Sequence, residues 1–211
     1  MPSRYNLAGS AGYLNYPGAM AVTPDLLSRV AAETQRVLEP YTGADWTVPA
    51  GDLEWSCRYT GVHLADDYFS YAAQVVAQPV EGYLPVEVGV PSDADVEGLL
   101  HSIRMCAGLL STVAAAADPA SRGWHPNGTS DPYGFVAMGM VEGLVHTYDI
   151  ASGLGSDWRP PAELCRPVLE RLFPQAPEGD PTDVLLWCAG RSSLGDRPRL
   201  TQWRWWSGVP G

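Results

Sequence analysis

One stretch of twenty residues, Val136 to Gly155, reads VAMGMVEGLVHTYDIASGLG and is apolar on nearly all sides when it is drawn as an α-helix. A helix of this kind is buried over most of its surface by neighbouring elements. Glu142 and His146 stand four residues apart within it, so both side chains project from the same face. A charged glutamate in such surroundings is costly unless it is paired or bound to a cation. The stretch therefore predicts a buried helix that carries half of a metal site.

Three other long segments have helical periodicity. The first follows VTPDLLSRVAAETQRVLEPY, where Thr23 is a good N-cap and Pro24 suits the first turn. The second runs from about Asp52 to Val76, and Ser92 or Asp93 opens the third. Four long helices joined by unequal loops predict a four-helix bundle.

The rest of the chain differs in character. PAELCRPVLERLFP and DPTDVLLWCAGR predict two short helices, and RLTQWRWWSG has the alternation of a strand. A short strand is also expected within AQPVEGYLPVEVGVPSD. The predicted fold is thus mainly α, a four-helix bundle with a C-terminal elaboration of short helices and a strand. We divide it into an extended N-terminal arm (1–22), the bundle (23–155) and the elaboration packed on the bundle (156–211), all in one structural domain.

Charge and composition narrow the class of protein. The 211 residues carry a net charge of −11, which argues against a nucleic-acid partner because phosphate binding needs a basic surface. No run of eighteen apolar residues is present, and the N-terminus lacks the apolar core of a signal peptide, so we expect a cytoplasmic protein without a membrane partner. The four cysteines have no CxxC spacing and are expected to be small buried hydrophobes.

A metal site on the Val136–Gly155 helix needs a ligand from elsewhere. Besides His146, the chain has His63, His101 and His125. His125 lies in the loop GWHPNG and is expected near solvent, and His101 lies in mid-helix among residues of mixed character. His63 has a side of small residues that would admit a close neighbour. Three protein ligands with an open fourth position form the catalytic pattern of Zn²⁺, which makes His63 the preferred third ligand.

Three quoted segments, VHLADDYFSYA, VEGLVHTYDIASGLG and LERLFP with DVLLWCAGR, together resemble the mycothiol-dependent maleylpyruvate isomerase-like group. That group belongs to the superfamily of bundle metalloproteins called DinB-like or YfiT-like, and the resemblance covers about residues 23–191. It implies a DinB-like bundle in which His63, Glu142 and His146 bind a divalent metal, usually zinc. It also implies a mycothiol-like thiol as co-substrate. All thirteen basic residues are Arg, as in GC-rich genomes, which fits an actinobacterial source.

For several other side chains the sequence leaves two possible roles open. Asp149 accepts a hydrogen bond from a ligating imidazole, or it pairs with an arginine near the helix end. Arg191 contacts a carboxylate of the substrate or thiol cofactor, or it forms a salt bridge at a helix C-terminus. Asp66 and Asp67 follow His63 by about a turn; one of them joins the site, or both lie on a solvated face, which is the preferred reading because Asp is usually exposed. Three tryptophans pack against the bundle or line a ligand pocket: Trp203, Trp205 and Trp206.

The favoured function is an enzyme in which a metal-bound thiolate attacks an electrophilic carbon of a small substrate, giving thiol transfer or cis–trans isomerisation. Alternatives on the same bundle are a metal-dependent hydrolase that uses bound water, a specialised natural-product enzyme, and a non-catalytic protein that binds a small ligand. Zinc is the expected metal, while Ni²⁺, Fe²⁺ and Mn²⁺ stay open because two nitrogens and a carboxylate suit several metals. A homodimer is also left open.

Overall fold

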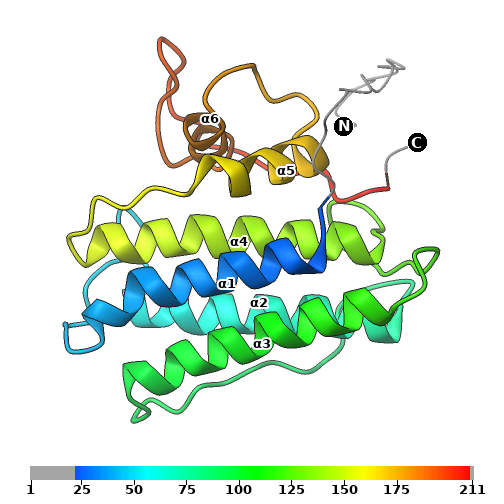
Figure 1. The fold of residues 1–211 in the computed structure, drawn as a ribbon, viewed down its shortest axis with the longest axis horizontal. Helices are drawn as coiled ribbons and strands as arrows, with labels where there is room; N and C mark the ends of the chain where they lie inside the picture. The colour runs from blue at the N-terminus through cyan, green and yellow to red at the C-terminus, as the bar shows by residue number, and fades with distance from the viewer. Residues whose placement is uncertain (1–21, 210–211) are drawn as a thin grey trace, which may run out of the picture.

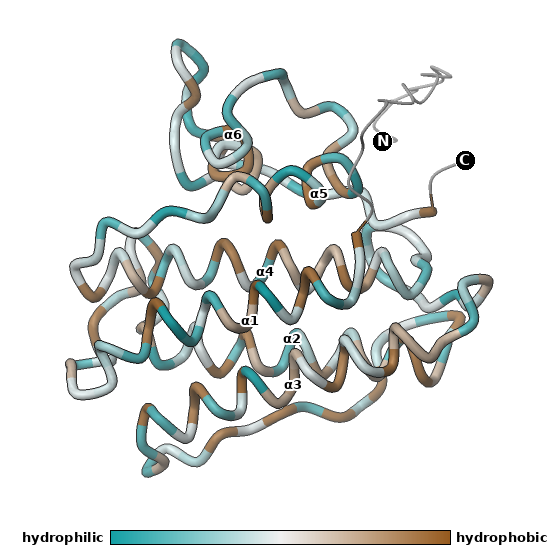
Figure 2. The backbone as a smooth tube through the Cα atoms, viewed as in Figure 1, coloured by the Kyte–Doolittle hydropathy of each residue, from teal (hydrophilic) through white to brown (hydrophobic). Residues whose placement is uncertain are grey.

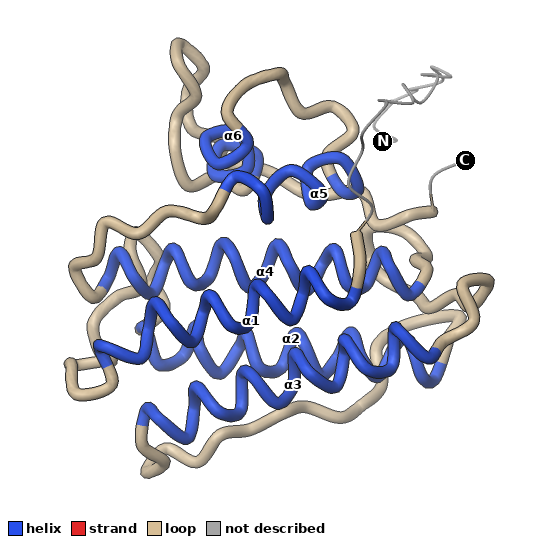
Figure 3. Tube along the Cα trace, viewed as in Figure 1, coloured by secondary structure: helices blue, strands red, loops and turns tan. Residues whose placement is uncertain are grey.

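The computed structural model describes residues 22–209, and the regular structure of this range is helical (Figures 1 and 3). The elements are α1 (Pro24–Leu38), a 3-10 turn η1 (Glu39–Tyr41), α2 (Cys57–Ala77), α3 (Val96–Ala116), α4 (Pro132–Gly153), α5 (Ala162–Leu172) and α6 (Pro181–Cys188). The predicted mainly α fold and the two short C-terminal helices are confirmed. The expected N-terminal arm lies, apart from Val22, outside the described residues.

Helices α1 to α4 form the bundle. Both α1 and α2 pack against α3 and α4. In Figure 1, α2 and α3 run in the same direction, and residues 78–95 return along the bundle to connect them. On the other side, α5 packs against α4, and α6 packs against α5. The result is a four-helix bundle with one long crossover and two extra helices that cover α4.

The positions of α1 and α4 account for their different compositions. Polar and apolar turns alternate along α1, which has one face in the core and one toward solvent (Figure 2). Helix α4 is contacted by α1, α2, α3 and α5, and nearly all of its residues are buried. Gly143 permits this crowding, because a Cβ there would lie 2.2 Å from the hydroxyl oxygen of Tyr68. The predicted burial of this helix on nearly all sides is therefore confirmed.

The N-caps decide where the first two helices begin. Thr23 caps α1 as predicted, since its side chain accepts a hydrogen bond from the backbone N–H of Leu26. Helix α2 begins at Cys57 and not at Asp52. Ser56 is its N-cap, and the residues before it form turns.

The starts of α3 and α4 also differ from the prediction. Asp95 caps α3 through its side chain, so the expected openings at Ser92 or Asp93 are wrong. Helix α4 begins at Pro132, ahead of the predicted Val136. A nearby Asp or Ser is an equally good cap by type, so only the local backbone selects among them.

Neither expected strand is present in residues 22–209. The crossover and the Trp-rich segment near the C-terminus have irregular backbone, and strand-like pairing is limited to isolated bridges such as Pro49 with Ser56. The Trp-rich segment packs instead against α5, where the N–H of Trp206 donates to the carbonyl of Leu172 at 2.8 Å. Alternation alone predicts a strand, but a strand also needs a neighbouring strand to pair with.

Helix α3 is long and apolar enough to cross a membrane by length and composition. A single such helix is weak evidence, because a helix in the core of a bundle has the same character. In this protein α3 packs against α1 and α2, and its buried residues belong to the common core.

Candidate metal centre

Facing turns of α2 and α4 bring together four titratable side chains, which we call the histidine–carboxylate cluster: His63, Asp67, Glu142 and His146. Along α2, Nε2 of His63 lies 3.1 Å from Oδ2 of Asp67. Along α4, Nε2 of His146 lies 3.2 Å from Oε2 of Glu142. The two imidazole rings meet edge to face with centroids 5.3 Å apart. One donor atom from each of His63, Asp67 and His146 lie within 4.8 Å of one another, as a metal site requires.

Asp67 is the member of this cluster for which the sequence favoured the other reading. The preferred reading placed it with Asp66 on a solvated face, which is wrong for Asp67: the side chain is 17% exposed, and its buried Oδ2 accepts no hydrogen bond, although Nε2 of His63 lies 3.1 Å away. Asp66 accepts a hydrogen bond from the N–H of Val88 at 2.6 Å and takes no part in the cluster. The i,i+4 spacing of His63 and Asp67 repeats that of the pair on α4, and this was the available signal.

Asp149 fulfils both of the roles that the sequence left open. Its Oδ2 lies 3.2 Å from Nδ1 of His146, and its two oxygens accept hydrogen bonds from Arg191, from Nε at 3.1 Å and from Nη2 at 2.7 Å. A carboxylate on Nδ1 fixes the orientation of the imidazole and leaves Nε2, which faces Glu142, as the nitrogen that could bind a metal. Arg191 therefore forms a buried salt bridge, the second of its two predicted readings.

The electrostatics of the cluster centre on His146. Burial disfavours its charged form, but hydrogen bonds and charges from Asp149 and Glu142 outweigh burial and raise its pKa to about 9. Burial raises the pKa of Glu142, yet the neighbouring His146 brings it below its ordinary value. The pKa of Asp67 is raised well above its ordinary value by burial and by the charge of Glu142. Burial, followed by the charge of His146, lowers the pKa of His63.

These observations fit a divalent cation. A carboxylate is costly in a buried site when its oxygens accept no hydrogen bond, and Oδ2 of Asp67 is such an oxygen. Two imidazoles with carboxylates form a donor set common to zinc and other divalent transition metals. Tyr71 completes the site from α2, since its hydroxyl donates to Oε1 of Glu142 at 3.1 Å and orients that carboxylate.

A cavity of about 420 Å³ adjoins the cluster, and His63, Glu142 and His146 form part of its wall. Its other charged residues are Glu54 and Arg191. The remaining lining is apolar: Leu53, Trp55, Val141, Val145, Trp203 and Trp205. Two of the three C-terminal tryptophans thus line a cavity, whereas Trp206 is 51% exposed and lies outside it.

The other two histidines lie away from the cluster. His101 is exposed on α3. His125 was expected near solvent, but it is only 5% exposed, because the C-terminal segment covers its loop and places the Ser207 hydroxyl 3.1 Å from its Nδ1. This burial lowers the pKa of His125 to about 4.

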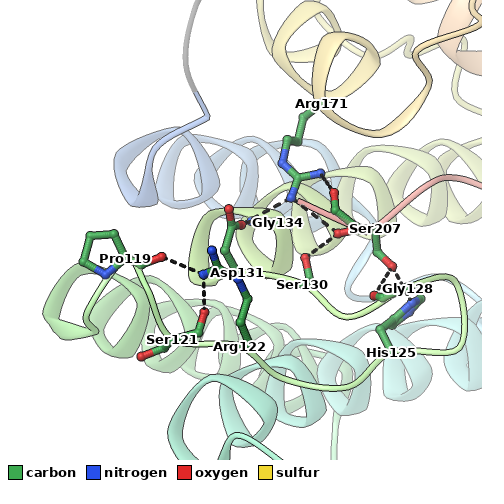
Figure 4. Close-up of polar contacts among 11 residues, drawn as sticks. Pro119, Ser121, Arg122, His125, Gly128, Ser130, Asp131, Gly134, Arg171 and Ser207 are labelled. Atoms are coloured by element: carbon green, nitrogen blue, oxygen red, sulfur yellow. Dashed lines mark hydrogen bonds and ion pairs between the residues drawn. The ribbon is translucent and has the colours of Figure 1, made fainter. Parts of the chain in front are cut away.

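His125 belongs to a second group of largely buried polar residues (Figure 4). We call it the tail anchor and define it as His125, Ser130, Asp131, Arg171 and Ser207. Within it, the Ser130 hydroxyl donates to the carbonyl of Ser207 at 2.6 Å, and Arg171 lies 3.3 Å from Asp131. The tail anchor attaches the C-terminal segment to the start of α4 and to α5.

No family model, curated protein or solved structure matches the chain. What the site can do is therefore argued from its own residues and their contacts.

Proposed function

We propose that this protein is a divalent-metal enzyme, with zinc as the expected metal, that uses a low-molecular-weight thiol of the mycothiol kind. Its reaction is transfer of that thiol to a small electrophilic substrate, or cis–trans isomerisation through thiol addition and elimination. The observation that carries the proposal is the buried histidine–carboxylate cluster in the wall of a cavity. Buried charges with unsatisfied oxygens are unfavourable for folding and are typical of functional sites.

The proposed ligands are His63, Glu142 and His146, with Asp67 as a further carboxylate beside them. Asp149 holds Nδ1 of His146, and Tyr71 holds one oxygen of Glu142, so the donor atoms that face the cavity are oriented in advance. A bound divalent cation would supply the stabilisation that makes a coordinated thiol a thiolate at neutral pH. Most of the cavity lining beside that nucleophile is apolar, which strengthens electrostatic interactions there.

The thiol is assigned to a co-substrate because the protein's own cysteines are unsuited to the task. All four are free and buried. Burial raises the pKa of Cys57, Cys106 and Cys188 to about 11 and that of Cys165 to about 12, so each is a neutral thiol at pH 7. None of them lines the cavity. A thiolate nucleophile must therefore enter from solution.

The test combines metal content with thiol dependence. Elemental analysis of the protein, purified without chelator and then supplied with Zn²⁺, should give about one equivalent per chain. Zinc-loaded protein should accelerate the reaction of mycothiol with 1-chloro-2,4-dinitrobenzene, and chelation should abolish the acceleration. A protein that neither retains nor takes up a divalent metal would overturn the proposal. Metal-dependent turnover of an ester substrate without any thiol would assign the hydrolase alternative instead.

A further inference from the structure

Three tryptophans dominate the wall of the cavity. Trp55 meets the ring of His63 edge to face at a centroid distance of 4.8 Å. Trp203 and Trp205, which come from the C-terminal segment, line the same cavity. Their ring centroids are 5.8 Å apart, and the two ring planes are inclined by 41°. Indole faces and edges offer large, rigid surfaces for stacking with a planar ring. The shape of the wall favours an aromatic ligand.

The positive charge of Arg191 is neutralised by the carboxylate of Asp149. Its Nε and Nη2 donate to the two oxygens of Asp149, and its Nη1 donates to the carbonyl of Ala189 at 2.8 Å. The side chains of Arg191 and Asp149 are only 9% and 4% exposed, and the guanidinium lies over the ring of Trp203 at 5.5 Å. A ligand carboxylate could bind the Arg191 guanidinium only by breaking its buried ion pair with Asp149. The Asp149 carboxylate would then be a buried charge without its partner.

The other cationic group of the described lining, His146, is also already paired, because it lies between the carboxylates of Glu142 and Asp149. Arg191 is the only Lys or Arg residue of the described lining, and Glu54 and Glu142 both lie in the wall. A divalent cation at the histidine–carboxylate cluster would have its two charges balanced by Asp67 and Glu142. With the thiolate of the proposed co-substrate at the open position of the metal, a second anion would find no unpaired positive charge in the wall and would lose its hydration without compensation.

The tryptophan wall is held in place by contacts outside the cavity. Arg171 donates to the carbonyl of Gly208 at 3.0 Å, and the N–H of Trp206 donates to Leu172 (Figure 4 shows the tail anchor). Trp203 and Trp205 belong to this fixed segment and need not be ordered when a ligand arrives. A preorganised wall of this kind gives affinity and selectivity for one shape of ligand.

We infer that the substrate taken by this cavity is an uncharged aromatic small molecule, bound against Trp55, Trp203 and Trp205, and not a carboxylic acid. The inference rests on the proposed function, because it names the substrate class of the same site. It narrows the electrophile to one with a planar apolar ring and no anionic group.

A matched pair of probes tests this directly. We would titrate 2-naphthol and 2-naphthoate into zinc-loaded protein at pH 7 by isothermal titration calorimetry, with mycothiol present to occupy the open position of the metal. The two probes share a ring system and differ in charge. The expected result is at least tenfold tighter binding of 2-naphthol. Equal affinities, or a preference for 2-naphthoate, would overturn the inference.

Variants locate the binding surface. Trp203→Leu and Trp55→Leu should each weaken binding of 2-naphthol about tenfold or more. Trp206→Leu is the control, because Trp206 belongs to the same segment as Trp203 but lies outside the cavity. Trp55 lies on an exposed loop, so its variant keeps the fold even if Trp203→Leu does not, which circular dichroism would verify. Unchanged binding in Trp55→Leu and in folded Trp203→Leu would overturn the assignment of the wall.

The same titrations separate this inference from the proposed function. The titrations are repeated on chelator-treated protein, and the zinc uptake of the protein is measured in parallel. Ligand selectivity and zinc uptake are then two independent results. Selective binding of 2-naphthol by a protein that takes up no zinc would remove the proposed function and support the ligand class. Zinc uptake without selectivity for 2-naphthol would keep the proposed function and overturn the assigned ligand class.

Discussion

Two buried polar groups lie along α4, the tail anchor at its N-terminal end and the histidine–carboxylate cluster at and beyond its middle, and each contains histidine and aspartate. In the tail anchor, near the N-terminal end, the partners of His125 are hydroxyl and backbone groups, and Arg171 is divided between Asp131 and backbone carbonyls. In the histidine–carboxylate cluster, His146 lies between the carboxylates of Glu142 and Asp149, and a third carboxylate, Asp67, has a buried oxygen that accepts no hydrogen bond. The tail anchor is close to satisfied by the protein itself, and the cluster is not.

The difference separates structural polar groups from functional ones. Both histidines are buried, yet the pKa of His125 falls to about 4 and that of His146 rises to about 9. Burial acts in the same direction on both, so the opposite outcomes come from the neighbouring charges. Surplus carboxylate, and not burial alone, is what distinguishes the candidate cation site from the tail anchor.

The largest expected effect separates the two histidines by metal content. His146→Ala should lower bound zinc from about one equivalent to near zero and abolish metal-dependent activity, because it removes a central donor. His125→Ala is the matched control, and it should retain zinc because His125 lies outside the cluster. Elemental analysis of both folded variants makes the comparison. Stoichiometric zinc in His146→Ala would contradict the site assignment.

The next effect concerns the two carboxylates of the cluster. Glu142→Gln and Asp67→Asn should each weaken zinc binding by about 10–100-fold, which competition with a chromophoric chelator would measure. Asp67→Asn should at the same time stabilise the metal-free protein by about 1 kcal/mol, because the raised pKa of Asp67 means that its ionisation opposes folding at pH 7. Unaltered zinc affinity in Asp67→Asn would leave Glu142 as the carboxylate ligand and remove Asp67 from the site.

A smaller effect tests the structural role of the tail anchor. Arg171→Met should destabilise the protein by about 2–4 kcal/mol, because it leaves Asp131 and the carbonyl of Gly208 without their partner. Arg166→Met, at an exposed position of the same helix, should change stability by less than about 0.5 kcal/mol. Urea denaturation measures both variants. Similar stabilities would show that the anchor contributes little, and zinc content should be unchanged in either case.

The last prediction concerns protonation at neutral pH. In metal-free protein at pH 7, long-range ¹H–¹⁵N NMR should find His146 protonated and His125 neutral. The unfolded chain binds a proton at His125 below about pH 6.5 and the folded chain only below about 4, so His125 lowers stability as pH falls through that window, by roughly 1–3 kcal/mol. His146 has the opposite sign: its contribution is full below about pH 6.5 and is lost as pH rises through about 9. If both histidines titrated near 6.5, the contrast between the two groups would fail.

Much of the site follows from local rules that the sequence displays. The apolar circumference of α4 predicts its burial, and the four-residue spacing puts Glu142 and His146 on one face because helix geometry is local. The meeting of His63 with His146 was also expected, and their rings lie 5.3 Å apart. Helix starts were less accurate, because several residues near each start are good caps by type.

The sequence by itself determined the mainly helical fold, the buried α4 helix and its Glu142–His146 pair, since each depends on residues within a few turns of one another. Only the tertiary structure decided that Asp67 is buried beside His63, that Arg191 is bound by Asp149, and that Ser207 covers His125. The last two contacts join residues 42 and 82 positions apart in the chain. Burial and pairing across such separations depend on how whole helices and loops pack, and no local pattern encodes them.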